Sequence, residues 1–216
     1  MKPRKPASGQ QLGFDALLSD AANSNAHRLL AREAAHLPGT FEEALLFYHG
    51  LIERHHAAML AADWDKVVAF REEAHRLAEK LNGFEPGICA HNDAPGCRLE
   101  NEARAVEGTA PLWGQAGSFE ITHKTMRVRV EMDGLFAIGA RYMTWPGFSA
   151  HAVEWHKPFL SETGYRSFLG LHGELVPGQT PGGFAADVVA AHVTRTLKGK
   201  LLPIESNYRE RAEQAA

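Results

Sequence analysis

The strict alternation of apolar and charged residues in MRVRVEM, residues 126–132, constrains the fold of this chain more than any other stretch. A period of two predicts a β-strand with one face buried and one face in water. Asp133-Gly134 follows directly, and this dipeptide accepts the positive φ angles of a two-residue hairpin turn. We therefore predict a hairpin whose second strand runs through LFAIGARY, residues 135–142.

That hairpin sets the expected surroundings of two arginines on the polar face of the first strand. Arg127 and Arg129 share this face with Glu131. A two-residue register would place the arginines opposite Ala140 and Ile138. We expect a local ion pair to Glu131 or a neighbour, with phosphate binding as the alternative.

The rest of the chain divides into helical and strand-like patterns. Apolar residues at helical spacing run to about residue 82, with Thr40 and Asp63 as predicted helix N-caps. Later elements are predicted at residues 119–123, 150–155 and 165–170 (strands) and 183–198 (helix). We predict an α+β fold: N-terminal antiparallel helices followed by an antiparallel β-sheet closed by a C-terminal helix.

Changes in composition predict the domain organisation. The predicted segments are a flexible basic arm (1–10), a helical region (11–82), a linker or ordered loop (83–118), an α+β domain (119–200) and a polar tail (201–216). The net charge of −3 argues against binding to nucleic acid by bulk charge alone. The N-terminus does not match a secretory signal, and no apolar run approaches the roughly 20 residues that span a bilayer. With two cysteines, we expect a cytoplasmic protein and no membrane partner.

Both cysteines lie in GICAHNDAPGCRLE, residues 87–100. Cys89, His91, Asp93 and Cys97 are metal-ligand types, but no Cys-x-x-Cys pair is present. The Asn-Asp and Pro-Gly dipeptides favour a connector built from turns, with inert thiols. A zinc site and a redox pair are the alternatives.

A second metal pattern, Glu-x-x-His, recurs in the helical region. It occurs at Glu33/His36, Glu53/His56 and Glu72/His75. This spacing puts a carboxylate and an imidazole on one helix face, as in di-iron bundles. The helical wheel turns Glu72 away from the apolar stripe, so we expect solvated or edge-packed histidines. We predict no metal and no cofactor.

Residue types that are common in binding sites are most concentrated in WPGFSAHAVEWHKPFLSETGYRSFLG, residues 145–170. We call this segment the aromatic/basic rim. Aromatic side chains beside Lys and Arg suit a nucleotide or partner interface, whereas the alternative is that the aromatics form the core of a small sheet. The predicted ligand-binding residues are His151, Trp155, His156, Lys157, Ser161, Glu162, Tyr165 and Arg166.

These residues support three hypotheses of function. The first is a binding protein that presents the rim to a small ligand or protein partner, with its helices supporting homo-oligomers. The second is an enzyme with acid–base groups from His151, His156 and Glu162, although Ser149 in GFSAH lacks the full nucleophile elbow. The third is a single-stranded nucleic-acid binding protein using the same rim. A Gly-rich entry into the last predicted helix, at Thr180, is a weaker candidate anion site.

Overall fold

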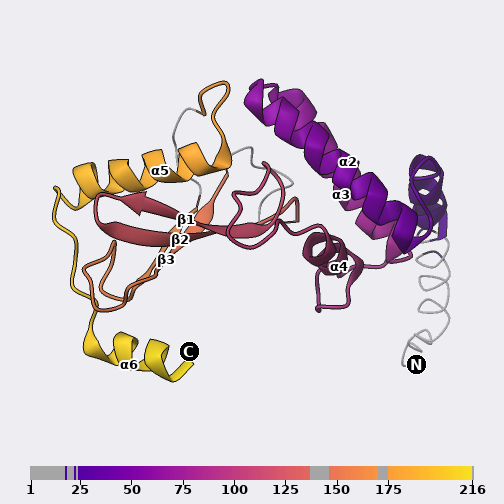
Figure 1. The fold of residues 1–216 in the computed structure, drawn as a ribbon. Coiled ribbons are helices and arrows are strands. Elements are labelled where there is room, and N and C mark those ends of the chain that lie inside the picture. The colour runs from indigo at the N-terminus through magenta and orange to yellow at the C-terminus, as the bar shows by residue number, and fades with distance from the viewer. Residues whose placement is uncertain (1–17, 19–21, 23, 137–145, 170–174, 216) are drawn as a thin grey trace, which may run out of the picture.

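A helical part and a sheet part lie side by side in the computed structural model of this protein (Figure 1). The structure describes residues 18, 22, 24–136, 146–169 and 175–215. The elements are α2 (Phe41–Leu60), α3 (Trp64–Leu81), α4 (Pro95–Glu102), β1 (Gly117–His123), β2 (Met126–Met132), β3 (Phe148–Ala152), β4 (Tyr165–Phe168), α5 (Pro181–Ala191), the π-helical turn η1 (His192–Thr196) and α6 (Ser206–Ala215). The predicted α+β fold is confirmed.

The two long helices begin at their predicted N-caps. At the start of α2 the Thr40 hydroxyl oxygen accepts the backbone N–H of Glu43, and the hydroxyl donates to the Glu43 carboxylate at 3.0 Å. At the start of α3 the Asp63 carboxylate accepts the backbone N–H of Lys66 at 3.3 Å. Each cap satisfies a backbone donor that the helix itself leaves unpaired. The short connection then packs α2 and α3 side by side as a hairpin.

The apolar residues form two cores. One core lies between the sheet and α5, and includes Val128, Val130, Phe148, Phe184 and Val189. The other lies among α2, α3 and α4, and includes Tyr48, Leu51, Leu77 and Leu99. Met59 and Val67, at the turn end of the α2–α3 hairpin, belong to the first core. The hairpin therefore packs against the sheet at one end and against α4 at the other.

The sheet is antiparallel throughout, with strand order β1-β2-β3-β4. The alternation predicted for β2 is confirmed, because Val128 and Val130 are buried while Arg127 and Arg129 are exposed. Helix α5 covers the apolar face (Figure 1). The predicted strands near 119–123, 150–155 and 165–170 correspond to β1, β3 and β4, although β3 begins and ends earlier than predicted.

The two-residue hairpin predicted at Asp133-Gly134 is wrong. β2 pairs with β1 along one edge and with β3 along the other, so a strand starting at Leu135 has no free edge to join. The tight turn lies instead at the opposite end of β2, where Lys124 has a φ of 55°. Residues 137–142 of the predicted second strand lie outside the described residues.

Gly134 has a different role from the one predicted. A Cβ at this position would collide with the carboxylate of Glu100 on α4. The Asp-Gly dipeptide therefore lets the chain leave β2 in close contact with α4 rather than turn back beside β2. The local sequence could not reveal this contact, because Glu100 lies more than 30 residues earlier in the chain.

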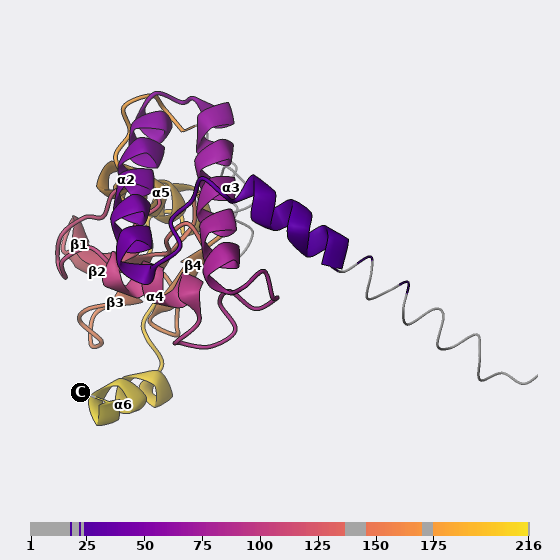
Figure 2. The ribbon, with the colours of Figure 1, turned by 90° about the vertical axis from the view of Figure 1, so that its right-hand side faces the viewer.

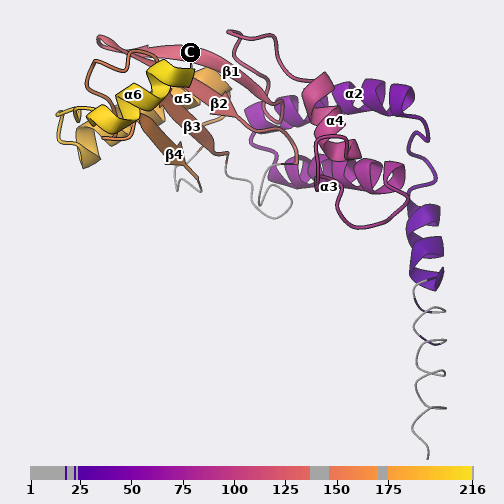
Figure 3. The ribbon, with the colours of Figure 1, turned by 90° about the horizontal axis from the view of Figure 1, so that it is seen from below.

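The two ends of the described chain differ in their packing, because the N-terminal helix extends away whereas Tyr208 of α6 packs against the sheet core. Residues 24–33 form a helix that extends away from the rest of the molecule (Figures 2 and 3). Helix α6 lies within the predicted polar tail, on the side of the sheet opposite α5 (Figures 1 and 3). Among the helices that the structure describes, none combines the length and apolarity required of a transmembrane span.

Candidate functional site

The face of the sheet opposite α5, on the same side as α6, carries a continuous set of polar side chains (Figure 1). Directly paired residues in neighbouring strands share a face. The register therefore defines this surface, which we call the open face: Ser118, Glu120, Thr122, Arg127, Arg129, Glu131, Ser149, His151, Tyr165 and Ser167. Its central row runs across all four strands, from Glu120 on β1 to Tyr165 on β4.

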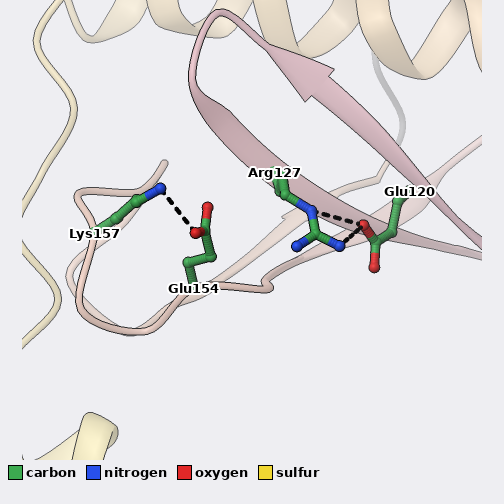
Figure 4. Close-up of polar contacts among 4 residues, drawn as sticks. All are labelled: Glu120, Arg127, Glu154 and Lys157. Carbon is green, nitrogen blue, oxygen red and sulfur yellow. Dashed lines mark hydrogen bonds and ion pairs between the residues drawn. The ribbon is translucent and has the colours of Figure 1, made fainter.

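The arginines of the open face are paired with carboxylates. Arg127 donates to Glu120 at 2.7 Å, diagonally across β1 and β2 (Figure 4). Arg129 lies 3.4 Å from Glu131 and 3.9 Å from Glu107. The local ion pairs expected for both arginines are confirmed, whereas the expected opposing residues were wrong because β1 and β3 flank β2. The open face is therefore of mixed charge rather than basic.

His151 lies at the centre of the open face. Its Nε2 is 3.1 Å from the hydroxyl of Ser149 and 3.4 Å from a carboxylate oxygen of Glu131. Its ring packs edge-on against Tyr165, with centroids 5.1 Å apart. A Ser-His-acid triad needs the serine and the acid on opposite ring nitrogens. Here both contacts involve the same nitrogen, so this grouping does not have triad geometry.

The structure divides the predicted rim residues between two faces of the sheet. Tyr165 pairs with His151 and lies on the open face, where it is 47% exposed. Arg166 pairs with the buried Ala150 and so lies on the α5 face of the sheet, at the edge strand β4, where its side chain is exposed. There burial lowers the pKa of His192, and the nearby Arg166 guanidinium lowers it further. Tyr165 and Arg166 therefore cannot meet one ligand on the same surface.

The loop between β3 and β4 holds the other predicted ligand-binding residues. Lys157 forms an ion pair with Glu154 at 2.8 Å (Figure 4). His156 lies 3.1 Å from Glu213 of α6. The side chain of Glu162 is exposed, and its backbone carbonyl accepts the N–H of Glu205. No hydrogen bond or ion pair joins His151, His156 and Glu162 in the parts of the chain that the structure covers.

Two further rim residues help to fold this loop. The Ser161 hydroxyl donates to the carbonyl of Tyr165 at 2.7 Å. Trp155 packs against the sheet core, and its ring occupies the space where a Cβ on Gly164 would lie. Among the other aromatic side chains of the rim, Phe148, Phe159 and Phe168 are buried, as the core alternative predicts. Trp145 lies outside the described residues.

A buried polar cluster that the sequence did not predict lies where the helical part meets the sheet part. His55 on α2 donates from Nδ1 to the carbonyl of Trp113 at 2.8 Å, and its Nε2 accepts from Arg71 at 3.0 Å. This tautomer follows from Nε2 being the acceptor. His56 accepts the N–H of Trp113, whose indole N–H donates to Gln179. The cluster joins α2 and α3 to the segment before β1 and to the segment before α5.

Burial controls the ionisation of this cluster. It lowers the pKa of His55 to about 3, an effect that the neighbouring Arg71 guanidinium reinforces. It also lowers the pKa of Arg71 to about 10. His55 is therefore neutral and Arg71 charged at neutral pH. The only sequence signal was that His55 falls on the apolar stripe of α2, between Leu51 and Met59.

The remaining candidates from the sequence are the N-cap of α5 and the possible metal ligands. The predicted N-cap of α5 is confirmed, because Thr180 accepts the N–H of Gly183 at 3.2 Å. No group of three or more His, Cys, Asp or Glu side chains suited to a metal ion occurs among the described residues. Two histidines of the Glu-x-x-His pairs form hydrogen bonds with the backbone. His56 accepts the N–H of Trp113, and Nδ1 of His75 lies within hydrogen-bond distance of the Arg71 carbonyl.

Comparison with known proteins gives a limited result. No family model matches the chain, and no solved structure matches it. Two curated proteins, both named Protein KlcB from Escherichia coli, are similar to it. One is 34% identical over 143 residues, covering 66% of this chain and 28% of that protein. The other is 32% identical over 165 residues, covering 74% of this chain and 38% of that protein. The chain thus matches well under half the length of these relatives.

Proposed function

We propose that this chain is a binding module that recognises a partner protein through the open face of its sheet. The observation that carries the proposal is the central row, in which partly exposed Arg129, His151 and Tyr165 lie side by side across three strands. Arg and Tyr are frequent anchor residues in protein interfaces. A sheet face also offers a broad surface on which such anchors hold fixed positions.

The charges of the open face favour a protein over a nucleic acid. Nucleic-acid binding relies on cations that are free to neutralise phosphates. Arg127 and Arg129 are each paired with glutamate, so a phosphate would have to displace a carboxylate. A partner protein with charges of both signs can instead complement the paired residues. An enzyme with the predicted acid–base groups receives less support, because their contacts are with different elements.

The similarity to Protein KlcB covers only part of each relative, as expected for a module within a longer chain. The matching segment is a part of longer proteins, so the relatives contain this unit together with additional sequence. The cytoplasmic location and the contribution of the helices to oligomers stay predictions. Sedimentation of the purified chain tests the second of these directly.

Site-specific photo-crosslinking tests the proposal. A benzophenone amino acid is placed at Tyr165 on the open face or at Leu46, which is 75% exposed on α2. Crosslinking in the native cell should give a discrete product from position 165 that is lost when Arg129 is replaced by Glu. Position 46 serves as the control for chance encounters. Equal products from both positions, or none from position 165, would contradict the proposal.

A further inference from the structure

The two cysteines lie together where the connector meets α4. The backbone N–H of Gly96 donates to the carbonyl of Ile88 at 2.8 Å, which closes the segment between the cysteines into a loop. A Cβ on Gly96 would lie 2.7 Å from the Sγ of Cys89, so this thiol lies directly against the first turn of α4. Cys97 is the next residue in that turn. The loop thus brings the two thiols together.

Neither thiol is sealed from solvent. Cys89 is exposed and Cys97 is partly exposed, so a small molecule in solution can reach them. Their local settings differ, because Cys97 lies in the first turn of α4 whereas Cys89 lies in the loop before it. Partial burial, reinforced by the adjacent Cys97 thiol, raises the pKa of Cys89 to about 12. Because Cys89 keeps its proton, we assign the first attack to Cys97.

A carboxyl group lies on the same helix, one turn beyond Cys97. Burial raises the pKa of Glu100, while hydrogen bonds from the backbone at Gly134 and Phe136 lower it in part. Its Oε1 is buried and forms no full hydrogen bond in the described part of the chain. The negative charge of Glu100 also raises the pKa of the Cys89 thiol, so the carboxylate lies close enough to act on this thiol and helps to keep it protonated. A buried carboxylate close to a protonated thiol can accept its proton as the thiol attacks.

We propose that Cys89 and Cys97 form a reversible disulfide by exchange with a low-molecular-weight disulfide of the glutathione type. This site is independent of the open face. In the first step the Cys97 thiolate attacks one sulfur of the oxidised glutathione, and the other sulfur leaves as a thiolate that takes a proton from water. Cys97 is then joined to glutathione by a mixed disulfide.

The second step closes the loop. Cys89 passes its proton to Glu100 and attacks the Sγ of Cys97, which releases the second glutathione thiolate. That thiolate takes up a proton, and Glu100 returns its own to water. The two cysteines are oxidised and one glutathione disulfide is reduced to two thiols. Glu100 acts through Cys89 and is a positioning and proton-accepting residue.

Mass spectrometry of the full chain in glutathione redox buffers tests the assignment. The wild type should convert from two free thiols to an internal disulfide, without glutathione bound at equilibrium. Cys89→Ser should stop at a mixed disulfide on Cys97. Cys97→Ser should acquire glutathione on Cys89 more slowly, because less thiolate is present. A wild type that binds glutathione on both cysteines, or stays reduced while free glutathione is oxidised, would overturn the proposal.

The role of Glu100 has its own matched control. Glu100→Gln should leave the rate of mixed-disulfide formation unchanged but slow its conversion to the internal disulfide by about tenfold or more. The same change at Glu102, which lies on the same helix in an ion pair with Arg98, should leave both rates unchanged. Circular dichroism of both variants checks that the fold is retained. Equal rates of loop closure in the two variants would exclude proton transfer to Glu100.

Discussion

The ring of His151 packs edge-on against Tyr165 across β3 and β4, with the two centroids 5.1 Å apart. This contact joins two residues of the proposed binding surface, beside the ion pair of Arg129 and Glu131. It lies on the outer side of a sheet whose inner side contributes Val128, Val130 and Phe148 to the core. Changes on this face can therefore affect binding without affecting the core.

We expect Tyr165→Ala and Arg129→Ala to change stability little. Both side chains are about half exposed, and exposed pairs of this kind contribute about 1 kcal/mol or less. Chemical denaturation should give an unfolding free energy within about 1 kcal/mol of the wild type for each variant. A loss of several kcal/mol would show that the open face is part of the structural core.

Acid should weaken the fold through buried histidines. His55 has its pKa lowered to about 3, so between about pH 6.5 and 3 the unfolded chain binds a proton that the folded chain excludes. The contribution of His55 to the free energy of unfolding is therefore fully present above about pH 6.5. It falls as the pH drops, by up to about 1.4 kcal/mol per pH unit. Burial lowers the pKa of His56 and His192 as well, which adds to the effect with the same sign.

Denaturant titrations at several pH values measure this dependence. His55→Gln should flatten the pH dependence, because the group that gains a proton on unfolding is gone. His156→Gln is the control, since this side chain is 73% exposed. A pH dependence that is the same in the wild type and in His55→Gln would contradict the assignment.

Gly114 should tolerate no side chain. Its φ is +87°, and a Cβ would lie 2.7 Å from Nδ1 of His55 and 2.6 Å from Leu135. Gly108 has a similar φ of +83° but open space around it, so Gly108→Ala measures backbone strain alone, about 1 kcal/mol. Gly114→Ala should cost about 1–3 kcal/mol more. Equal losses in the two variants would mean that the contact with His55 is unimportant.

Tyr48→Phe should be neutral or stabilising. Tyr48 is 1% exposed, and its hydroxyl lies near the backbone of Leu135 but forms no hydrogen bond of good geometry among the described residues. Removing a buried, unpaired polar group relieves its desolvation cost, by about 1 kcal/mol. Thermal and denaturant unfolding of the variant measure the change. A loss of more than about 1 kcal/mol would show that the hydroxyl contributes a stabilising contact.

Features that depend on neighbouring residues alone were predicted correctly from the sequence. The side chains of Thr40, Asp63 and Thr180 each cap a helix within three residues of their own position, and all three were identified in the sequence. The two faces of β2 were predicted for the same reason, since alternation depends on the strand alone. The predicted hairpin failed because the partners of β2 are determined by tertiary structure.

The candidate site was predicted less well. His151 and Tyr165 were both named, but Arg129 and Glu131 were considered apart from them because their strands were not known to be neighbours. The separation of Tyr165 from Arg166 could have been deduced from the sequence, since adjacent strand residues point to opposite faces. The contact of His55 with Arg71 and Trp113 could not, because it brings together residues up to 58 positions apart.

The most direct test of the open face compares two adjacent residues of β4. The binding affinity of the crosslinked partner, once purified, is measured for Tyr165→Ala and Arg166→Ala by titration calorimetry. An anchor residue contributes about 2 kcal/mol, so Tyr165→Ala should weaken binding roughly 30-fold. Arg166→Ala, on the opposite face, should leave it within about twofold. Equal affinities of the two variants, or a greater loss for Arg166→Ala, would contradict a binding surface on the open face.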